Sequence, residues 1–399
     1  MHDDRELGYL LKNGTRLKVL ERGLKVKITM TKKEKLMILK IAKKIWNKYK
    51  KRQAVKEFED PLKEKYKKLS VQRHLTKEQK KEIKTYFKDL TGEDVPLIWH
   101  EYMYSRTGVY SKKYIPSSLY KVTLLYRANV HGYRDSYADK NMAEVYLPDV
   151  KHPDMILKNM NGYFYIKDQP VTREEAITYC QNLDEVLIKP SLGTHGDGAR
   201  KLKVKDGITN IDGKTIGELF DSYEKNYCIQ GFIRQHERMK ALNPSSVNTI
   251  RILTYRSGME ILVLYTVIRI GRAGKEIDNE SAGGISTVIN SDGTLGKYAY
   301  GAPGVDKIET TDSGVRLEGY MIPSYHKVVE TVKKLHFKLP FFNLIGWDVA
   351  VDENGEPVLV EWNICTELSQ SANGPAFGEY TDRIITELMQ RPNGLNRKW

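Results

Sequence analysis

The spacing of apolar residues changes near residue 92 of the 399-residue chain. Before that point, apolar positions recur at helical intervals beneath a lysine-rich surface, as at Ile38, Ile41, Ile45 and Tyr49. The capping sequences TKKE and TKEQ, which start at residues 31 and 76, predict the first and third of three helices, and Gly92 ends the third. Asp60 and Pro61 are typical of an N-cap and a first-turn proline, so the second helix is expected to begin there.

After residue 92, short runs of β-branched and aromatic residues alternate with helical patterns. The runs predict strands at residues 185–190, 226–233, 247–258, 259–272 and 283–298. Helices are predicted at residues 172–182, 324–340 and 380–389, and His326 and His336, on the second of these, are expected at the surface. Mostly antiparallel strands mixed with helices in this way indicate α+β lobes rather than a doubly wound parallel sheet.

The apolar runs GWDVAV and PVLVEWN, joined by a polar turn, predict a β-hairpin at residues 346–363. If Asn354 and Gly355 form a two-residue turn with positive φ at both positions, Asp348 lies directly opposite Glu361. Asn363 then shares the face of Glu361, because side chains alternate along a strand. Like charges opposite each other destabilise a sheet, so two carboxylates and an amide on one face suggest a bound cation. A four-residue turn would change this register.

Charge is distributed unevenly along the chain. Residues 1–90 contain 28 Lys and Arg against 12 Asp and Glu, whereas the remaining residues contain 37 against 39. Three interpretations of the basic region remain open: a helical lobe that packs on the rest of the protein, a surface attracted to an anionic membrane, and a nucleic-acid contact. No nucleic-acid partner is expected, because no recognised binding motif accompanies the charge.

The cysteines and the apolar runs limit the class of protein. Three cysteines lie far apart without a C-x-x-C pair, so neither a disulfide framework nor a zinc cluster is expected. No run approaches the roughly 18 apolar residues of a membrane span, and MHDDRELGYL lacks the order of a signal peptide. The expected location is the cytoplasm, and the basic region leaves open a peripheral position at the inner face of the membrane.

The segment IKPSLGTHGDGARKL combines a strand end with a glycine-rich loop. The strand delivers Lys189 and breaks at Pro190, and Gly193, Gly196 and Gly198 follow. Glycines allow backbone amides to surround a phosphate, and a lysine adds a positive charge. Neither a P-loop nor a G-x-G-x-x-G pattern is present. With the acidic hairpin downstream, the loop predicts a nucleoside triphosphate bound with Mg²⁺, which prefers carboxylate and phosphate oxygens.

Six short motifs follow one another in a fixed order. They are YADKN, LIKPSLGTHGDGA, CIQGFI, VNTIRILT, DNESAGGIS and GWDVAVDENGEPVLVEWN. Together they resemble the ATP-grasp superfamily, and specifically its sugar-transfer-associated branch, over residues 97–388. The resemblance implies an α+β fold in which two lobes enclose an ATP cleft, preceded by the basic helical region. The boundaries expected from it are 1–92 for the basic region, 93–160 for the first part of the core, 161–232 for the small lobe and 233–399 for the large lobe.

The resemblance also implies which residues bind the nucleotide. Lys140 and Lys189 would contact the ATP phosphates. The glycine loop would close over them, and its residues are Gly193, Thr194, His195, Gly196 and Gly198. The linker after the next strand would read the adenine, and its residues are Gln230, Gly231, Phe232 and Ile233. At Gln230 the commoner family pattern has an acidic residue instead.

Further residues are implied at the reacting end of the cleft. Arg251 would contact the transferred phosphoryl group or an acyl phosphate and, with Lys189, is the expected catalytic residue. The Mg²⁺ ion would be held by Asp348, Glu361 and Asn363. The DNESAGGIS segment would supply the floor of the cleft through Asn279, Ser281 and Gly283, for which an ordinary hairpin connection is the alternative.

The branch implies an ATP- and Mg²⁺-dependent ligase that joins a carboxylate to an amine through an acyl phosphate and releases ADP and phosphate. Its substrates are expected to be small or glycan-linked acids and amines on the route to a surface polysaccharide. One alternative is a kinase that phosphorylates a hydroxyl on the same scaffold. The other is a non-catalytic nucleotide-binding protein that docks on an anionic membrane through residues 1–90.

Overall fold

The computed structural model describes residues 32–193, 198–275, 278 and 283–392 of the chain. The chain divides into two units, residues 1–54 and 55–399. Helix α2 (Lys32–Lys67) begins where TKKE predicts a helix, and Thr31 itself lies outside the described residues. In the first unit, several large apolar side chains of α2 are exposed, namely Met37, Ile41, Trp46 and Tyr49.

The prediction of a separate helix beginning at Asp60 is wrong, because α2 runs through Pro61 without a break. A proline inside a helix costs about 3 kcal/mol, since it removes a backbone hydrogen bond and crowds the preceding turn. Beyond Pro61, Leu62 and Tyr66 are buried in an apolar cluster that they share with helix α4 (Ile98–Thr107). This packing stabilises the last turns of α2, and the local signal at Asp60 does not reveal it.

Helix α3 (Lys77–Thr91) has the ends that the sequence predicts. The Thr76 hydroxyl accepts a hydrogen bond from the Gln79 N–H at 3.2 Å, and the Gln79 side chain accepts one from the Thr76 N–H at 3.0 Å. Gly92 ends the helix in the left-handed conformation at φ 69°. Local sequence therefore determines both ends of this helix.

Short helices lead from α4 to the first strand. They are α5 (Ser117–Leu119), η1 (Tyr120–Leu124), α6 (Leu125–Ala128), η2 (His131–Tyr133), α7 (Arg134–Tyr137), η3 (Lys140–Met142) and α8 (Ala143–Tyr146). The Asp139 carboxylate accepts a hydrogen bond from the Asn141 N–H at 3.0 Å and so caps η3. This cap fixes the backbone at Lys140, the first residue of η3.

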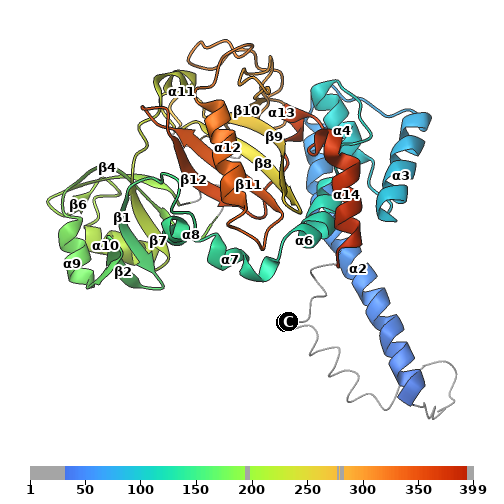
Figure 1. Cartoon of the computed structure of the whole chain (residues 1–399), viewed down its shortest axis with the longest axis horizontal. Helices are drawn as coiled ribbons and strands as arrows, with labels where there is room; N and C mark the ends of the chain where they lie inside the picture. The colour runs from blue at the N-terminus through green and yellow to red at the C-terminus, as the bar shows by residue number, and fades with distance from the viewer. Residues whose placement is uncertain (1–31, 194–197, 276–277, 279–282, 393–399) are drawn as a thin grey trace. The chain divides into compact units, whose positions relative to one another are not determined.

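A seven-stranded antiparallel sheet has the strand order β3-β2-β1-β7-β4-β5-β6. Its strands are β1 (Met155–Met160), β2 (Tyr163–Ile166), β3 (Gln169–Val171), β4 (Leu183–Pro190), β5 (Arg200–Lys205), β6 (Ile208–Thr209) and β7 (Tyr227–Gly231). Helices α9 (Arg173–Tyr179) and α10 (Ile216–Tyr223) pack against it through an apolar cluster that includes Ile188 and Ile229 (Figure 1). Because side chains alternate along a strand, Lys189 and Gln230 lie on the opposite face.

A second antiparallel sheet has the strand order β10-β9-β8-β11-β12. Its strands are β8 (Thr249–Ser257), β9 (Glu260–Ile270), β10 (Ile285–Val288), β11 (Leu344–Val351) and β12 (Pro357–Asn363). Helix α12 (Tyr325–His336) lies across β8 and β11 (Figure 1) and buries Val328 and Val332 against Ile252 and Trp347. The same packing buries His336, so the expected surface position of this residue is wrong.

The other face of the second sheet is divided into an apolar part and a charged part. Leu253 and Tyr255 of β8 lie in the apolar part, which packs against α3, α6 and helix α14 (Thr381–Gln390). Earlier on the same strand, Thr249 and Arg251 alternate with buried isoleucines and so share the face of Leu253. The charged part of this face holds the candidate site.

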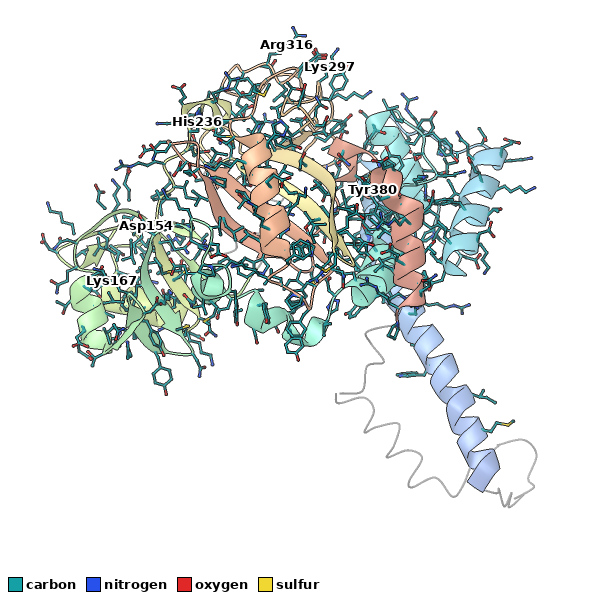
Figure 2. The ribbon with its side chains drawn as sticks, viewed as in Figure 1. Asp154, Lys167, His236, Lys297, Arg316 and Tyr380 are labelled. Carbon is teal, nitrogen blue, oxygen red and sulfur yellow. The ribbon has the colours of Figure 1, made fainter. Side chains whose placement is uncertain are left out.

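The remaining segments are mostly turns and short helices. The helices are α11 (Glu237–Leu242), α13 (Gln370–Asn373) and η5 (Gly378–Tyr380). His236 precedes α11, and the segment between β10 and α12, which carries Lys297 and Arg316, folds through isolated bridges (Figure 2). In the described part of the chain, no helix combines the length and the apolar character needed to cross a membrane.

The predicted fold class is confirmed: two antiparallel sheets with packed helices form an α+β protein, and a basic helical region precedes them. Every predicted strand overlaps an observed one, and the helices predicted at residues 172–182, 324–340 and 380–389 correspond to α9, α12 and α14.

Candidate functional site

The hairpin formed by β11 and β12 brings the predicted acidic residues together. Asp348 pairs with Glu361, and Gly346 pairs with Asn363. The Asn363 side-chain amide donates hydrogen bonds to Asp348 Oδ2 at 3.0 Å and to Glu361 Oε1 at 3.2 Å. The predicted pairing of the two acids, with the amide beside them, is confirmed.

The turn of this hairpin differs from the prediction. Asp352 and Glu356 face each other, because the Asp352 N–H donates to the Glu356 carbonyl at 3.0 Å, so the turn has three residues. Of the expected pair, Gly355 has positive φ, 79°, whereas Asn354 does not. A bulge after Asp348 then shifts the register back by one residue. The acids face each other because the longer turn and the bulge compensate.

The Asp348 carboxylate, 2% exposed, is held by two arginines. Arg251, its neighbour on β8, donates from Nε and Nη2 to the two carboxylate oxygens at 2.6 and 2.7 Å. Arg269 on β9 donates from Nη1 to Oδ1 at 3.1 Å. Burial raises the pKa of Asp348, but attraction to Arg251 and Arg269 outweighs burial and holds this pKa below its usual value. Asp348 is therefore an ionised carboxylate with protein cations around it.

Glu361 is the more open of the two acids. Its side chain is 29% exposed, and Lys140 Nζ lies 3.7 Å from its Oε2 atom. The Lys140 ammonium also donates to the Gly193 carbonyl at 3.2 Å, which links η3 to the start of the glycine loop. The carboxylate of Glu361 thus faces the first residue of η3.

Lys189, at the end of β4, is a buried cation without a direct ion-pair partner among the described residues. Its side chain is on the cavity face of the first sheet, and the residue is 8% exposed. Burial lowers the pKa of this lysine, and repulsion from Lys140 adds to the effect, while Cys228 and Glu361 partly offset it. Among the described residues the ammonium has no hydrogen-bond or ion-pair partner. A buried lysine without an anion is costly, so this position is suited to a negatively charged ligand.

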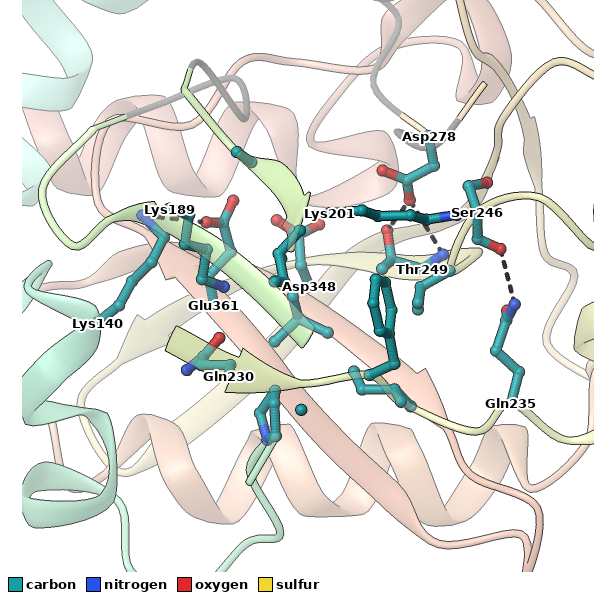
Figure 3. A pocket seen from close by; sticks show the side chains of 18 of the residues that line it. Lys140, Lys189, Lys201, Gln230, Gln235, Ser246, Thr249, Asp278, Asp348 and Glu361 are labelled. Atoms are coloured by element: carbon teal, nitrogen blue, oxygen red, sulfur yellow. Dashed lines mark hydrogen bonds and ion pairs between the residues drawn. The ribbon is translucent and has the colours of Figure 1, made fainter. Parts of the chain in front are cut away.

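A cavity of about 290 Å³ is lined by residues of both sheets (Figure 3). This volume lies near the lower end of the roughly 300–1,000 Å³ that small-molecule sites occupy. Figure 3 shows Lys140, Lys189 and Glu361 close together, and Asp278, Thr249 and Ser246 on the other side of Asp348. The residues predicted from the sequence that line the cavity are Lys140, Lys189, Gly193, Gln230, Gly231, Phe232, Ile233, Asp348 and Glu361.

Other predicted residues are not part of the described lining. These are Gly198, Arg251, Gly283 and Asn363. Arg251 lies behind Asp348 and donates to the Thr366 hydroxyl at 3.0 Å, and Asn363 reaches the site through the two carboxylates. A further group of predicted residues lies outside the described part of the chain, namely Thr194, His195, Gly196, Asn279 and Ser281.

Several polar residues that line the cavity were not assigned to the site from the sequence. They are Lys201, Gln235, Ser246, Thr249 and Asp278. Arg269 lines the cavity as well. Asp278 accepts hydrogen bonds from the Thr249 N–H at 3.1 Å and the Thr249 hydroxyl at 2.5 Å. Burial raises the pKa of Asp278, and the attraction of Arg269 offsets only part of the rise. The available signal was its place at the head of DNESAGGIS, a segment that already pointed to the cleft.

The chemistry of the site fits a magnesium nucleotide. Asp348 and Glu361 present carboxylate oxygens, the ligand type that Mg²⁺ prefers, and the buried Lys189 and its neighbour Lys140 provide positive charge for phosphate oxygens. The described residues contain no cluster of three or more His, Cys, Asp or Glu side chains placed to hold a metal ion. Phosphate and water oxygens would therefore have to complete the coordination, as is usual for Mg²⁺.

A comparison with protein families identifies the family of this chain. The profile of the family described as sugar-transfer associated ATP-grasp matches residues 139–384, more than half of the chain. No curated protein matches the sequence. Solved structures to which the chain shows some similarity include D-alanine–D-alanine ligase from Helicobacter pylori, with 15% identity and a TM-score of 0.36, and biotin carboxylase from Campylobacter jejuni, with 11% identity and a TM-score of 0.38. The match covers 64% of this chain in both cases, but 59% of the first structure and 47% of the second.

Proposed function

Because the chain belongs to the sugar-transfer-associated ATP-grasp family, we propose that it is an ATP- and Mg²⁺-dependent ligase that joins a carboxylate to an amine. The observation that carries the proposal is the buried Lys189, which lacks an anionic partner among the described residues and lines a cavity that also contains Lys140 and Glu361. A triphosphate supplies the negative charge that Lys189 lacks, and the carboxylate beside Lys140 suits its metal ion.

The nucleotide is proposed to lie along the cavity between the two sheets. Lys140 and Lys189 hold the phosphates, and the backbone near Gly193 lies beside them. The base lies against the linker, where Gln230 and Phe232 line the cavity. Glu361 and Asp348, with Asn363 behind them, would hold Mg²⁺, which when bound neutralises phosphate charge during transfer.

The chemistry proposed for the substrates has two steps. A carboxylate oxygen attacks the γ-phosphorus of ATP, ADP leaves, and an acyl phosphate forms. The amine nitrogen then attacks the acyl carbon, phosphate leaves, and the nitrogen loses a proton to give the amide. Arg269 lines the cavity and Arg251 does not, so we assign the direct contact with phosphoryl oxygens to Arg269 and a positioning role at Asp348 to Arg251. The protein contributes positioning and charge neutralisation.

The substrates are proposed to be acids and amines used in building a surface polysaccharide. The description of the family as sugar-transfer associated supports this class. A uronic acid with an amino acid or amino sugar is the first pair to test, since both carry the required groups.

Hydroxylamine offers a test that does not depend on knowing the amine. The protein is incubated with ATP, Mg²⁺, hydroxylamine and a panel of carboxylic acids, and ADP and hydroxamate are measured. The proposal predicts hydroxamate and ADP in equal amounts for at least one acid, because hydroxylamine intercepts an acyl phosphate. A phosphorylated hydroxyl without hydroxamate would identify a kinase instead. If the protein binds ATP but forms neither ADP nor hydroxamate with any acid of the panel, the result would favour the non-catalytic alternative.

We also propose a peripheral contact between residues 1–90 and an anionic membrane surface. The excess of lysine and arginine in this region supports it, as do Trp46 and Tyr49, which are exposed and stack on each other in α2. The full-length protein should sediment with vesicles that contain phosphatidylserine at low salt and be released by high salt. Equal sedimentation with neutral vesicles would contradict an electrostatic contact.

A further inference from the structure

Arg269 joins two buried acids that both line the cavity. Its Nη1 atom donates to Asp348 Oδ1 at 3.1 Å, and its Nη2 atom lies 3.3 Å from Asp278 Oδ1. The side chains of Arg269, Asp278 and Asp348 are 13%, 11% and 2% exposed. Arg269 thus stands between the acid proposed to bind Mg²⁺ and a second acid without a proposed ligand.

The Asp348 carboxylate has no free acceptor site in this arrangement. An ionised carboxylate offers about four lone-pair directions. Its Oδ1 atom accepts from Arg251 Nε and Arg269 Nη1, and its Oδ2 atom accepts from Arg251 Nη2 and Asn363 Nδ2. A metal ion that binds Asp348 must therefore displace one of these donors.

Of the two arginines, Arg269 is the one that can leave Asp348 more easily. Arg251 contacts Asp348 through two parallel hydrogen bonds and is also anchored to the Thr366 hydroxyl at 3.0 Å. Arg269 makes a single hydrogen bond to Asp348, lines the cavity, and has Asp278 as a second anionic partner. Its charge stays compensated when it releases Asp348, so the buried guanidinium is not left alone.

We propose that Arg269 blocks Asp348 in the nucleotide-free protein by donating a hydrogen bond to its carboxylate. When a divalent cation binds Asp348, Arg269 gives up this hydrogen bond and keeps its ion pair with Asp278. This inference rests on the proposed function, in which Asp348 and Glu361 hold the metal ion. It gives Asp278 a positioning role: its charge draws Arg269 away from Asp348. A cation on Asp348 repels Arg269 in the same direction, because like charges at this distance repel strongly in a buried site.

The proposal predicts opposite effects for two substitutions around one metal site. Arg269→Gln removes the competing cation and should strengthen binding of Mn²⁺, used as the probe without nucleotide, by about tenfold or more. Asp278→Asn keeps an oxygen for the Thr249 hydrogen bonds but removes the charge that attracts Arg269. It should therefore weaken Mn²⁺ binding several-fold, because Arg269 then pairs with Asp348 alone.

Mn²⁺ binding to the full-length protein can be measured by electron paramagnetic resonance of the free ion. Arg272→Gln is the matched control, since Arg272 lies three residues further on, pairs with Asp312 at 2.7 Å and does not line the described cavity. Its Mn²⁺ affinity should equal that of the unsubstituted protein. Arg269→Met serves if Arg269→Gln does not fold, because it also removes the positive charge while keeping an unbranched side chain, and it should strengthen Mn²⁺ binding to a similar extent.

The two possible failures are distinguishable. An unsubstituted protein that binds no ATP contradicts the proposed function. Mn²⁺ affinities that are equal in Arg269→Gln and the unsubstituted protein, or weaker in both Arg269→Gln and Asp278→Asn, overturn the inference about Arg269. Tighter binding in the first variant with weaker binding in the second supports it.

Discussion

Replacing Lys189 by methionine should stabilise the nucleotide-free protein and abolish its response to ATP. The ammonium is buried on the cavity face of the first sheet without an anionic partner among the described residues. Methionine has a similar length and no charge to desolvate. A fully buried ion costs several kcal/mol, and because this lysine lines an open cavity we expect a gain of about 1–3 kcal/mol in the free energy of unfolding. The midpoint of thermal unfolding, Tm, should rise by about 1 °C for each kcal/mol gained, because the entropy of unfolding grows with chain length.

The pH dependence of the free energy of unfolding also reports the cost of burying the charge of Lys189. Burial lowers the pKa of Lys189, so the native state binds this proton less tightly than the unfolded state does. The destabilisation caused by the buried charge is fully present below the lowered native-state pKa. It decreases as pH rises from that value toward the pKa of the unfolded state. The gain from Lys189→Met should therefore shrink at alkaline pH.

Urea denaturation and thermal shift, each with and without ATP and Mg²⁺, provide the assay. At 100 times its dissociation constant, ATP should stabilise the unsubstituted protein by about 2.7 kcal/mol and Lys189→Met by almost nothing. Lys158→Met is the control, since Lys158 is a buried lysine of the same sheet that is paired with Asp168 at 2.6 Å and Glu144 at 3.2 Å. This control should gain no stability and lose up to about 1 kcal/mol. A Lys189→Met protein that is destabilised like the control, or that still responds to ATP, would refute the reasoning.

Three further predictions concern the metal ligand, the sheet and a buried histidine. Glu361→Gln should lower ATP turnover at least about 100-fold while changing the free energy of unfolding by no more than about 1 kcal/mol, and near-normal Mg²⁺-dependent turnover would contradict the metal assignment. Gly346→Ala should destabilise the protein by about 1–3 kcal/mol in urea, because a Cβ atom there would lie 2.5 Å from Thr366 Oγ1; an unchanged urea midpoint would be the contrary result. Burial lowers the pKa of His336 to about 4, so stability should fall by up to roughly 3 kcal/mol as pH drops from 6.5 to 4. His336→Phe should flatten this urea-measured dependence, and an unchanged slope would show that other groups cause it.

The parts of the fold that local sequence determines could be predicted. The ends of α3 follow from Thr76, Gln79 and Gly92, whose capping hydrogen bonds lie within this helix. At Asp60 and Pro61 the local signal was equally clear, but the packing of α2 on α4 outweighed it. Such packing depends on residues distant in the sequence, and the helical pattern does not contain it.

The candidate site shows the same limit. The facing of Asp348 and Glu361 was predicted from a two-residue turn, but the turn has three residues, and a bulge that the sequence pattern did not predict restores the register. Arg269 was not assigned to the metal site, because it is one charge at the end of an apolar run. Its partner Asp348 lies 79 residues further along the chain, and only the fold brings the two together.

A crystal structure of the full-length protein with Mg²⁺ and a non-hydrolysable ATP analogue tests the central claim most directly. The account predicts a triphosphate in contact with Lys140 and Lys189, the base against the linker at Gln230, and Mg²⁺ bound to Glu361 and Asp348. Arg269 should then contact Asp278 and no longer Asp348. A nucleotide bound elsewhere, or one whose phosphates do not contact Lys189, would contradict the account.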